Sequence, residues 1–275
     1  MVLENVPFML SLNRGAAIRH VVGALEELGY AWAYRTVDTR AFGLPQRRER
    51  VFLIASREEH PARLMFSSDA GERWPTDHAG RACGFYWTEG LRGLGWAVDA
   101  VPTLKGGSTL GIPSPPAYWS PSGEFFTPDL RDCERLQGFT ADWTLPLETA
   151  GGRASLRWKL VGNAVSVPVA AWVGSLLGGS GAWPVASGTL PLDAGWPPAG
   201  YGDKRGRYRV DVSKWPVSVG ASSLVDFLRF APRPLSLKAA SGFWSRLQRS
   251  SLRYPREFAR DLQAHISTFS DGRRA

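Results

Sequence analysis

Residues 156–169 read LRWKLVGNAVSVPV, and the prediction of the fold starts from this stretch. Gly162 and Asn163 tolerate a positive φ, so the pattern predicts a loop that reverses the chain there. Ser166 can cap a helix and Pro168 suits a first helical turn, which predicts a helix directly afterwards. The positive end of that helix would lie beside Asn163 and suit an anionic ligand. A core helix behind a tight turn would give the same pattern.

The composition limits the classes of protein to which this chain can belong. The chain has 275 residues, a formal net charge of +8 and a sequence pI near 9.9, which favours a polyanionic partner such as nucleic acid. Its two cysteines, Cys83 and Cys133, have no metal-ligand spacing and cannot form a disulfide framework, which fits a reducing cytoplasm. No metal site, no membrane-spanning stretch and no signal peptide are expected.

The first part of the chain has the pattern of an α/β sheet. The apolar residues 1–3 are expected to end a strand whose beginning is not in the sequence. Apolar residues at helical spacing predict a helix over 14–28, and residues 30–37 and 50–55 have strand patterns. Ligands of such sheets bind beyond the carboxyl ends of strands, and Glu4 falls at such an end. A lone glutamate there is otherwise a solvated surface residue.

The segment 46–50 reads QRRER and directly precedes a predicted strand. If it is extended, Gln46, Arg48 and Arg50 share one face. Two guanidinium groups at that spacing can grip a phosphate or orient an aromatic carbonyl. The alternative is a solvated run of charges with a local ion pair.

Residues 58–125 combine many aromatic side chains with frequent glycine and proline, which predicts an irregular region. The loop 101–109 is rich in small hydrogen-bond donors, and such loops on a scaffold commonly bind a ligand. A small irregular domain with an aromatic core is the alternative. Farther along, Thr127 or Asp129 is expected to cap a short helix that runs through Leu136.

Four short motifs lie in one order along the chain: Glu-Asn-Val within 3–6, Gln-x-Arg-x-Arg at 46–50, Arg-Leu-Gln-Gly-Phe at the end of 131–139, and Gly-Asn-Ala-Val within 159–169. In this order they resemble the carboxyl-terminal half of the DNA cytosine-5 methyltransferases. The resemblance implies a base-flipping reaction on double-stranded DNA. A cysteine attacks carbon-6 of the everted cytosine, and carbon-5 takes the methyl group of S-adenosylmethionine.

The resemblance also implies catalytic roles. Glu4 would hydrogen-bond ring nitrogen-3 and the exocyclic amine of the cytosine, and so offset charge as the thiolate adds. Arg50, together with Arg48, would orient the ring carbonyl and help to fix the pocket.

The binding residues follow from the same resemblance. The residues expected beside the methionine end of the cofactor are Asn163, Ala164 and Val165. Thr103 and Leu104 resemble a pair that the family uses near the flipped base. Arg135 and Gln137 would hold the target-recognition region against the catalytic core.

The sequence departs from the family pattern at two motifs. The cofactor loop Phe-x-Gly-x-Gly and the nucleophile motif Pro-Cys-Gln are absent, and neither cysteine stands in that setting. The strands expected before Glu4 are absent too, which would leave an open sheet edge, an uncovered helix face and an incomplete cofactor pocket. We therefore expect a split-enzyme half or a truncated fragment that is inactive alone. In a split enzyme, a second chain supplies the nucleophile and the N-terminal half of the sheet.

The predicted fold class is α/β. It comprises an incomplete Rossmann-like methyltransferase sheet with the later strands only, an irregular and mainly β target-recognition region, and a small helical C-terminal extension. The predicted boundaries are 1–57 for the partial catalytic unit, 58–125 for target recognition, 126–177 for the return to the catalytic unit with its cofactor-side helix, 178–210 for a linker or strap, and 211–275 for the basic helical extension.

The extension lies beyond the motifs. A short strand is expected near 207–212, and Ser222 and Ser236 are candidate helix caps. Arginines among aromatic residues suit contacts with the DNA backbone, but a helical cap with a solvated basic face would have the same composition.

Two other functions remain open on the sequence. The chain could be a non-catalytic DNA-binding specificity subunit, or a relative of the tRNA cytosine-5 methyltransferases, which share two of the motifs. The preferred interpretation is DNA modification by a cytoplasmic restriction-modification or phage enzyme. The recognised DNA sequence cannot be predicted, because groove readout depends on side-chain placement.

Overall fold

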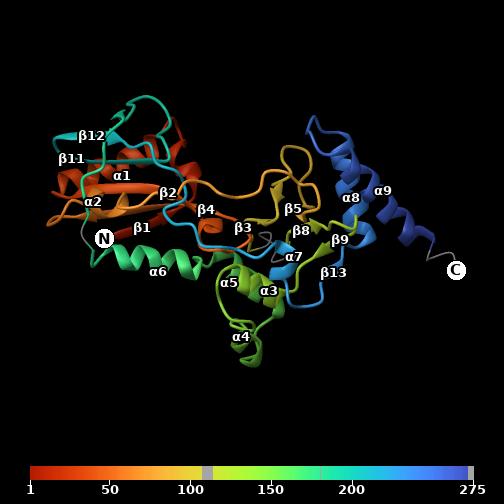
Figure 1. Cartoon of the computed structure of the whole chain (residues 1–275). Coiled ribbons are helices and arrows are strands. Elements are labelled where there is room, and N and C mark those ends of the chain that lie inside the picture. Colours follow the sequence, from red (N-terminus) through yellow and green to blue (C-terminus); the bar gives the residue numbers. More distant parts are fainter. Residues whose placement is uncertain (107–113, 180, 272–275) are drawn as a thin grey trace. The chain divides into compact units, whose positions relative to one another are not determined.

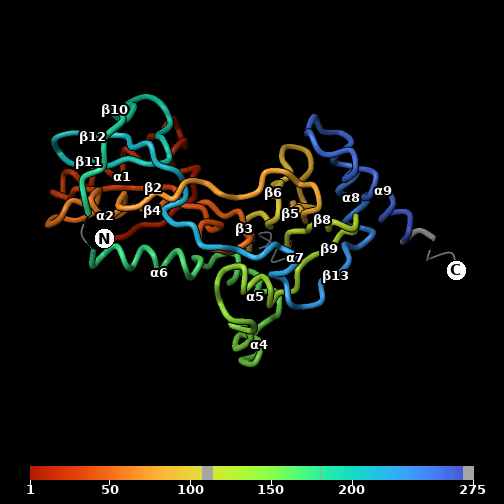
Figure 2. Tube along the Cα trace, viewed as in Figure 1, coloured from red at the N-terminus to blue at the C-terminus, as the bar shows by residue number. Residues whose placement is uncertain are grey.

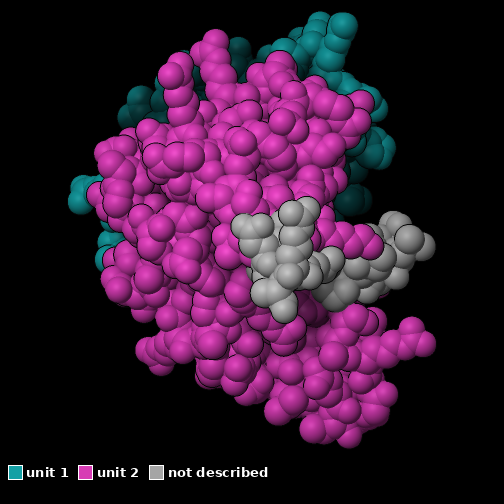
Figure 3. Space-filling model, turned by 90° about the vertical axis from the view of Figure 1, so that its right-hand side faces the viewer, with its two compact units in different colours: residues 1–43, 49–73, 168–220 teal, residues 44–48, 74–167, 221–275 magenta. Residues whose placement is uncertain are grey.

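The structure is a computed structural model that describes residues 1–106, 114–179 and 181–271, with side chains up to residue 268. Part of the predicted loop 101–109 therefore lies outside the described residues. The chain forms two compact units, coloured separately in Figure 3. Unit 1 comprises residues 1–43, 49–73 and 168–220, and unit 2 comprises residues 44–48, 74–167 and 221–275.

Unit 1 is built on a six-stranded sheet of order β1-β4-β2-β11-β12-β10 (Figure 1). Every neighbouring pair is antiparallel, so β1 and β2 run parallel to each other on either side of β4. The strands are β1 (Val2–Asn5), β2 (Ala31–Asp38), β4 (Glu49–Ser56), β10 (Gly188–Thr189), β11 (Ala199–Asp203) and β12 (Gly206–Arg209). The helices are η1 (Pro7–Leu10), α1 (Ala16–Glu27), η2 (Thr39–Phe42), α2 (Ala62–Met65) and α6 (Val167–Leu176), of which Val167 belongs to unit 2.

The predicted helix over 14–28 and the strands over 30–37 and 50–55 are confirmed as α1, β2 and β4. Apolar residues three and four apart on α1 pack against alternate residues of β2 and β4, which is how an amphipathic helix covers a sheet. The buried residues of this core include Ile18, Val22, Leu25, Trp32, Tyr34, Val51, Leu53 and Trp196.

The segment 178–210 was expected to be a linker or a strap, but it extends the sheet. In the sheet, β11 lies next to β2, β12 next to β11, and β10 at the edge next to β12 (Figure 2). Trp196 stacks on Trp32 and Tyr34 with ring centroids 5.6 and 5.8 Å away. Glycine, proline and alanine in this segment signalled irregular backbone, and the sequence pattern gave no sign of the long-range pairing with β2.

The other edge of the sheet is β1. Among the described residues, β1 pairs with β4 alone. Its first residues, Val2 and Leu3, and the preceding Met1 are apolar, with exposed fractions of 39, 38 and 53%. An apolar strand with one free edge is a ready template for a further strand.

Unit 2 contains a five-stranded antiparallel sheet of order β13-β9-β8-β5-β6 and a parallel pair, β3-β7. The strands are β3 (Gln46–Arg47), β5 (Cys83–Phe85), β6 (Ala97–Val98), β7 (Val101–Pro102), β8 (Ala117–Trp119), β9 (Phe125–Thr127) and β13 (Arg233–Pro234). The helices are α3 (Leu130–Leu136), α4 (Pro146–Thr149), α5 (Ala154–Asn163), α7 (Leu224–Phe227), α8 (Leu237–Gln248) and α9 (Arg256–Asp271). Phe243 of α8 and Phe258 of α9 pack on Phe85 of the sheet, so the helical extension completes this core.

The helix caps predicted for unit 2 are confirmed in part. Asp129 caps α3 and Ser236 caps α8, as predicted. Ser222 was a wrong choice, because Ser223 caps α7 and accepts from the amide of Asp226. A shift of one residue changes which side chain faces the free amides of the first turn.

The prediction of a turn at Gly162 and Asn163 is wrong. Both residues are helical within α5, and the chain leaves the helix at Ala164, whose backbone is extended. The break spans 164–166 before α6 begins, and Pro168 does lie in the first turn of α6. Gly162 is therefore needed for a close approach rather than for a positive φ.

The close approach is to the loop after β7. A Cβ on Gly162 would lie 2.2 Å from the amide nitrogen of Gly106 and 2.4 Å from the carbonyl carbon of Lys105. Both neighbours are backbone atoms, which cannot turn away as a side chain can.

Gly162→Ala is expected to lower the free energy of unfolding by about 1–3 kcal/mol, because the added methyl group overpacks this contact. The measurement is urea unfolding followed by circular dichroism. Gly174→Ala is the matched control, because Gly174 is also helical and a Cβ there meets nothing within 4 Å. The control is expected to be neutral or stabilising by about 0.5–1 kcal/mol. Equal stability of the two variants would contradict the role assigned to Gly162.

One run of sequence, Ala154–Leu176, is long and apolar enough to pass a test for a membrane span, contrary to the prediction. Its most apolar stretch of 18 residues has a mean hydropathy of 1.2, and 28% of that stretch is buried. The break at 164–166 divides the run into α5 and α6, of 10 residues each, and about 20 continuous helical residues are needed to cross a bilayer. The run is weak evidence for a span.

Candidate functional site

Glu4 and Arg50 meet in unit 1. Glu4 pairs with Phe52 in the β1-β4 register, so Arg50 lies two residues along β4 on the same face. The Nε atom of Arg50 is 3.0 Å from Oε1 of Glu4, with exposed side-chain fractions of 16% and 31%. Strand pairing thus joins two residues that the resemblance assigns to catalysis. A carboxylate and a guanidinium at a strand end can bind complementary edges of a polar ring.

Arg48 has different neighbours. It is 3% exposed and belongs to unit 2, where Nη2 donates to the carbonyl of Ala164 at 2.8 Å and Nη1 to that of Gly162 at 3.4 Å. A cation at the carboxyl end of α5 satisfies carbonyl groups that the helix leaves unpaired. Arg48 therefore holds the segment expected on the cofactor side, and its action on the cytosine carbonyl stays a prediction.

The segment 163–165 lies at the end of α5. Asn163 is exposed, and Ala164 and Val165 are half-buried. A Cβ on Gly106 would lie 3.3 Å from Oδ1 of Asn163, so this side chain lies over the loop after β7. Unit 2 therefore brings a predicted cofactor residue next to the loop expected near the flipped base.

An apolar hollow adjoins this segment within unit 2. It has a volume of about 350 Å³, and Ala164 forms part of its wall. The rings of Phe139 and Trp143 also line it and stack with centroids 5.3 Å apart. Such a surface suits a flat or apolar group better than a charged one.

Thr103 and Leu104 are held by β3. The parallel pairing of Gln46 with Val101 sets the start of this loop. The hydroxyl of Thr103 donates to the carbonyl of Arg47 at 2.9 Å, and the amide of Leu104 donates to Oε1 of Gln46 at 3.1 Å. The loop expected to read the base is thus fixed by the Gln-x-Arg-x-Arg motif.

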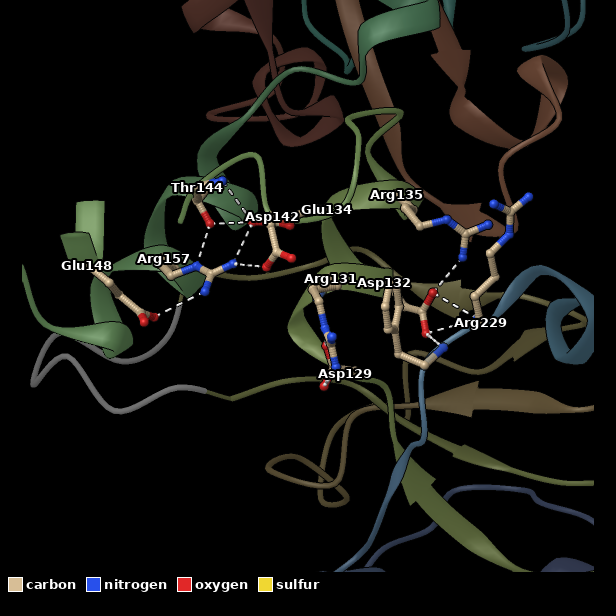
Figure 4. Close-up of polar contacts among 11 residues, drawn as sticks. Asp129, Arg131, Asp132, Glu134, Arg135, Asp142, Thr144, Glu148, Arg157 and Arg229 are labelled. Atoms are coloured by element: carbon tan, nitrogen blue, oxygen red, sulfur yellow. Dashed lines mark hydrogen bonds and ion pairs between the residues drawn. The ribbon is translucent and has the colours of Figure 1, made fainter. Parts of the chain in front are cut away.

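Arg135 fastens the segment that follows α7. Its Nη1 donates to Asp132 at 2.5 Å and to the carbonyl of Phe227 at 2.6 Å. Asp132 is fully buried and also accepts from the amides of Arg229 (Figure 4) and Phe230. No sequence pattern indicated these contacts. Arg135 is therefore a tether within unit 2.

Gln137 lies in the interior of unit 2 and is fully buried. Its Nε2 donates to the carbonyl of Val161 at 2.8 Å, and its Oε1 accepts from Ser166 at 2.7 Å and from Gln46 at 3.2 Å. Sequence reasoning missed the roles of Gln46 and Ser166, although both lie inside quoted motifs.

A buried ionic cluster centres on Arg157 of α5 (Figure 4). Its guanidinium donates to Glu134, Asp142 and Glu148 at 3.1, 3.3 and 3.1 Å. Nε also donates to the hydroxyl of Thr144 at 2.8 Å. Glu134 is fully buried, and its Oε2 has no hydrogen-bond partner among the described residues. The cluster joins α3, α4 and α5.

A hollow of about 580 Å³ adjoins the cluster. The charged residues that line it are Arg131, Arg157 and Arg233 and, with opposite sign, Asp129, Asp142 and Glu148. Because the charges balance, the hollow offers little net attraction to a phosphate.

Neither cysteine is suited to nucleophilic attack. Burial raises the pKa of the Cys83 thiol to about 12, and burial also raises the pKa of Cys133 well above its ordinary value. Both thiols are fully buried, so the reactive thiolate is scarce and inaccessible. In the described part of the chain, no group of three or more His, Cys, Asp or Glu side chains could hold a metal ion.

The chain is similar to known proteins along most of its length. Residues 1–82 match the family described as C-5 cytosine-specific DNA methylase. The type II methyltransferase M2.BsuMI of Bacillus subtilis is 48% identical over 276 residues, which cover 96% of this chain and 70% of that protein. The type II methyltransferase M.MspI of Moraxella is 26% identical, over 61% of this chain and 43% of that protein. Among solved structures, the Entamoeba histolytica methyltransferase EhMeth matches with a TM-score of 0.38 and 14% identity, over 64% of this chain and 61% of that one.

Proposed function

Because this chain belongs to the C-5 cytosine-specific DNA methylase family, we propose that it is the carboxyl-terminal part of a restriction-modification enzyme that methylates carbon-5 of cytosine in DNA. The observation that carries the proposal is the Glu4–Arg50 pair at the end of β1, at 3.0 Å, within a chain 48% identical to a type II methyltransferase. The enzyme acts in the cytoplasm on double-stranded DNA.

In this proposal Glu4 binds the everted cytosine. Its carboxylate is 31% exposed, so one oxygen can face a ligand while the other accepts from Arg50. The carboxylate accepts hydrogen bonds from the exocyclic amine and from ring nitrogen-3 once that atom gains a proton. The proton, taken up from solvent, neutralises the negative charge that the thiolate brings into the ring, and the carboxylate stabilises the protonated nitrogen. Arg50 holds Glu4 in place and donates toward the ring carbonyl.

S-adenosylmethionine supplies the methyl group when it is bound. The residues present are compatible with it, because Asn163 offers an exposed amide that can hydrogen-bond the charged methionine end. Asn163, Ala164 and Val165 would hold the methionine end. Thr103 and Leu104 would lie near the flipped base, and Arg135 and Gln137 would brace the target-recognition region.

The nucleophile comes from outside this sequence. The Pro-Cys-Gln motif is absent, and burial keeps Cys83 and Cys133 from reacting. We assign the thiolate to a second chain, which also carries the remaining strands of the sheet.

The open edge of β1 supports this assignment. Its apolar residues Val2 and Leu3 have exposed fractions of 39 and 38%. Apolar side chains along a free strand edge suit a further strand, which would pair with the backbone of β1 and cover these groups. The occupant is the strand-bearing segment of the second chain.

The test is co-expression with the polypeptide encoded by the neighbouring upstream reading frame. The purified pair is assayed for transfer of tritiated methyl groups to DNA, and host DNA is mapped by bisulfite sequencing. The pair is expected to methylate cytosine at fixed sites, whereas this chain alone gives background. A pair that carries Cys83→Ala and Cys133→Ala in this chain is expected to keep the full rate. Methylation by the isolated chain would refute the second-chain assignment, and an inactive pair would refute the proposed reaction.

A further inference from the structure

Gln46 connects three segments of unit 2. The side chain is fully buried, and each end of its amide is engaged. Its Oε1 accepts from the amide of Leu104 at 3.1 Å, and its Nε2 donates to the carbonyl of Leu136 at 2.8 Å and to Oε1 of Gln137 at 3.2 Å. A buried amide of this kind has one orientation only, because a rotation by 180° would set its NH₂ group against the amide of Leu104.

Gln137 continues the chain of hydrogen bonds across the break between α5 and α6. Its side chain donates to the carbonyl of Val161, before the break, and accepts from the hydroxyl of Ser166, the last residue of the break, at 2.8 and 2.7 Å. Its backbone carbonyl accepts from the amide of Val167 at 2.8 Å. Gln137 therefore fixes both ends of the segment 162–166.

The two glutamines form one path, which we call the amide relay: Leu104 amide, Gln46, Gln137 and Ser166. All four residues of the relay are buried, and hydrogen bonds in the interior are stronger and polarise one another. A buried amide left without its hydrogen-bond partner is strongly unfavourable. If either end of the relay moves, each glutamine side chain must therefore move with its partner to keep the hydrogen bond. The ends of the relay are the loop after β7 and the start of α6.

We propose that Gln46 and Gln137 are positioning residues that couple the loop at 103–106 to the segment at 163–166, so that a ligand bound at one raises affinity at the other. The inference rests on the proposed function, in which DNA contacts the first segment and S-adenosylmethionine the second. Coupling of this kind is reciprocal, and typical factors are about 5–150. Neither glutamine touches a reacting atom.

Gln137→Glu tests the relay because a protonated glutamic acid has the shape of glutamine. Its hydroxyl can donate to the carbonyl of Val161 while its carbonyl accepts from Ser166 and Gln46. The ionised form has no proton to donate and would face that carbonyl with a negative charge. Burial raises the pKa of an introduced carboxyl group, so the variant should resemble the wild type at low pH and lose the relay as the pH rises.

The first readout needs no ligand. Amide hydrogen exchange of Leu104 and Val167 is measured on the full chain between pH 5 and 9, as protection relative to the wild type. In Gln137→Glu, protection of both amides is expected to fall at least tenfold as pH rises. Gln248→Glu is the matched control, because Gln248 is exposed on α8, and no pH-dependent change relative to wild type is expected. Unchanged protection of Leu104 at every pH would overturn the relay.

The second readout is the affinity for S-adenosylmethionine with and without a cytosine-containing duplex, measured by calorimetry on the assembled pair of chains. The duplex is expected to raise that affinity about fivefold or more in the wild type and in Gln137→Glu at low pH. At high pH, the factor by which the duplex raises the affinity should fall to near 1 in Gln137→Glu but not in the wild type. Ser166→Ala, which removes one end of the relay, should lower the factor at all pH values. A factor that stays at the wild-type value in both variants would overturn the coupling, whereas binding of neither ligand would refute the proposed function and leave the exchange result standing.

Discussion

Glu4→Gln is expected to reduce the rate of methyl transfer by the assembled enzyme about 100- to 1,000-fold, the usual loss when one group that stabilises developing charge is removed. Glutamine keeps the length of the side chain but loses the negative charge that stabilises the proton on ring nitrogen-3. The ion pair of Glu4 with Arg50 is partly exposed, so its loss should change the free energy of unfolding by less than about 1 kcal/mol. The measurement is the single-turnover rate with saturating DNA and cofactor.

Glu26→Gln is the matched control for this prediction. Glu26 accepts from Arg207 at 2.6 Å in unit 1, and its side chain is 13% exposed, so the change removes a comparable ion pair. The control is expected to keep the wild-type rate. If Glu4→Gln also keeps that rate while DNA still binds, the catalytic role of Glu4 is wrong and a non-catalytic DNA-binding subunit becomes the better interpretation.

Arg157→Met is expected to lower the free energy of unfolding by about 3–5 kcal/mol, because it leaves Glu134 buried without its cation. Methionine keeps most of the volume, so the loss reports charge rather than a cavity. The cost should shrink as pH falls, because burial raises the pKa of an unpaired carboxyl group and the neutral form is cheaper to bury. Urea unfolding at pH 5 and pH 8 measures both effects.

A double-mutant cycle isolates the interaction. Glu134→Gln removes the negative charge but keeps an oxygen that can accept from the amide of Thr144. The double variant with Arg157→Met and Glu134→Gln is expected to be more stable than Arg157→Met alone. A loss below about 1 kcal/mol in the single variant would show that the cluster contributes no more than a surface ion pair.

Local patterns predicted α1, β2 and β4 of unit 1 well. The apolar spacing on α1, the alternation along β2 and the apolar run of β4 are properties of neighbouring residues, and these elements lie within two residues of their predicted bounds. The same reasoning failed at Gly162, because a glycine needed for close approach and one needed for a turn look alike in sequence. The short strand expected near 207–212 overlaps β12, whereas β11 was missed because it pairs with β2, far away in the chain.

By itself the sequence determined the family, through four ordered motifs, and named the acid, the guanidinium groups and the Gly-Asn segment of the candidate site. Only the tertiary structure decided that Arg50 pairs with Glu4 whereas Arg48 holds the end of α5, and that Gln46 and Gln137 are hydrogen-bonded to each other. The physical reason is that motif spacing is a property of the chain, whereas the partner of a buried polar group is set by strand register and by which carbonyl groups a helix leaves unpaired.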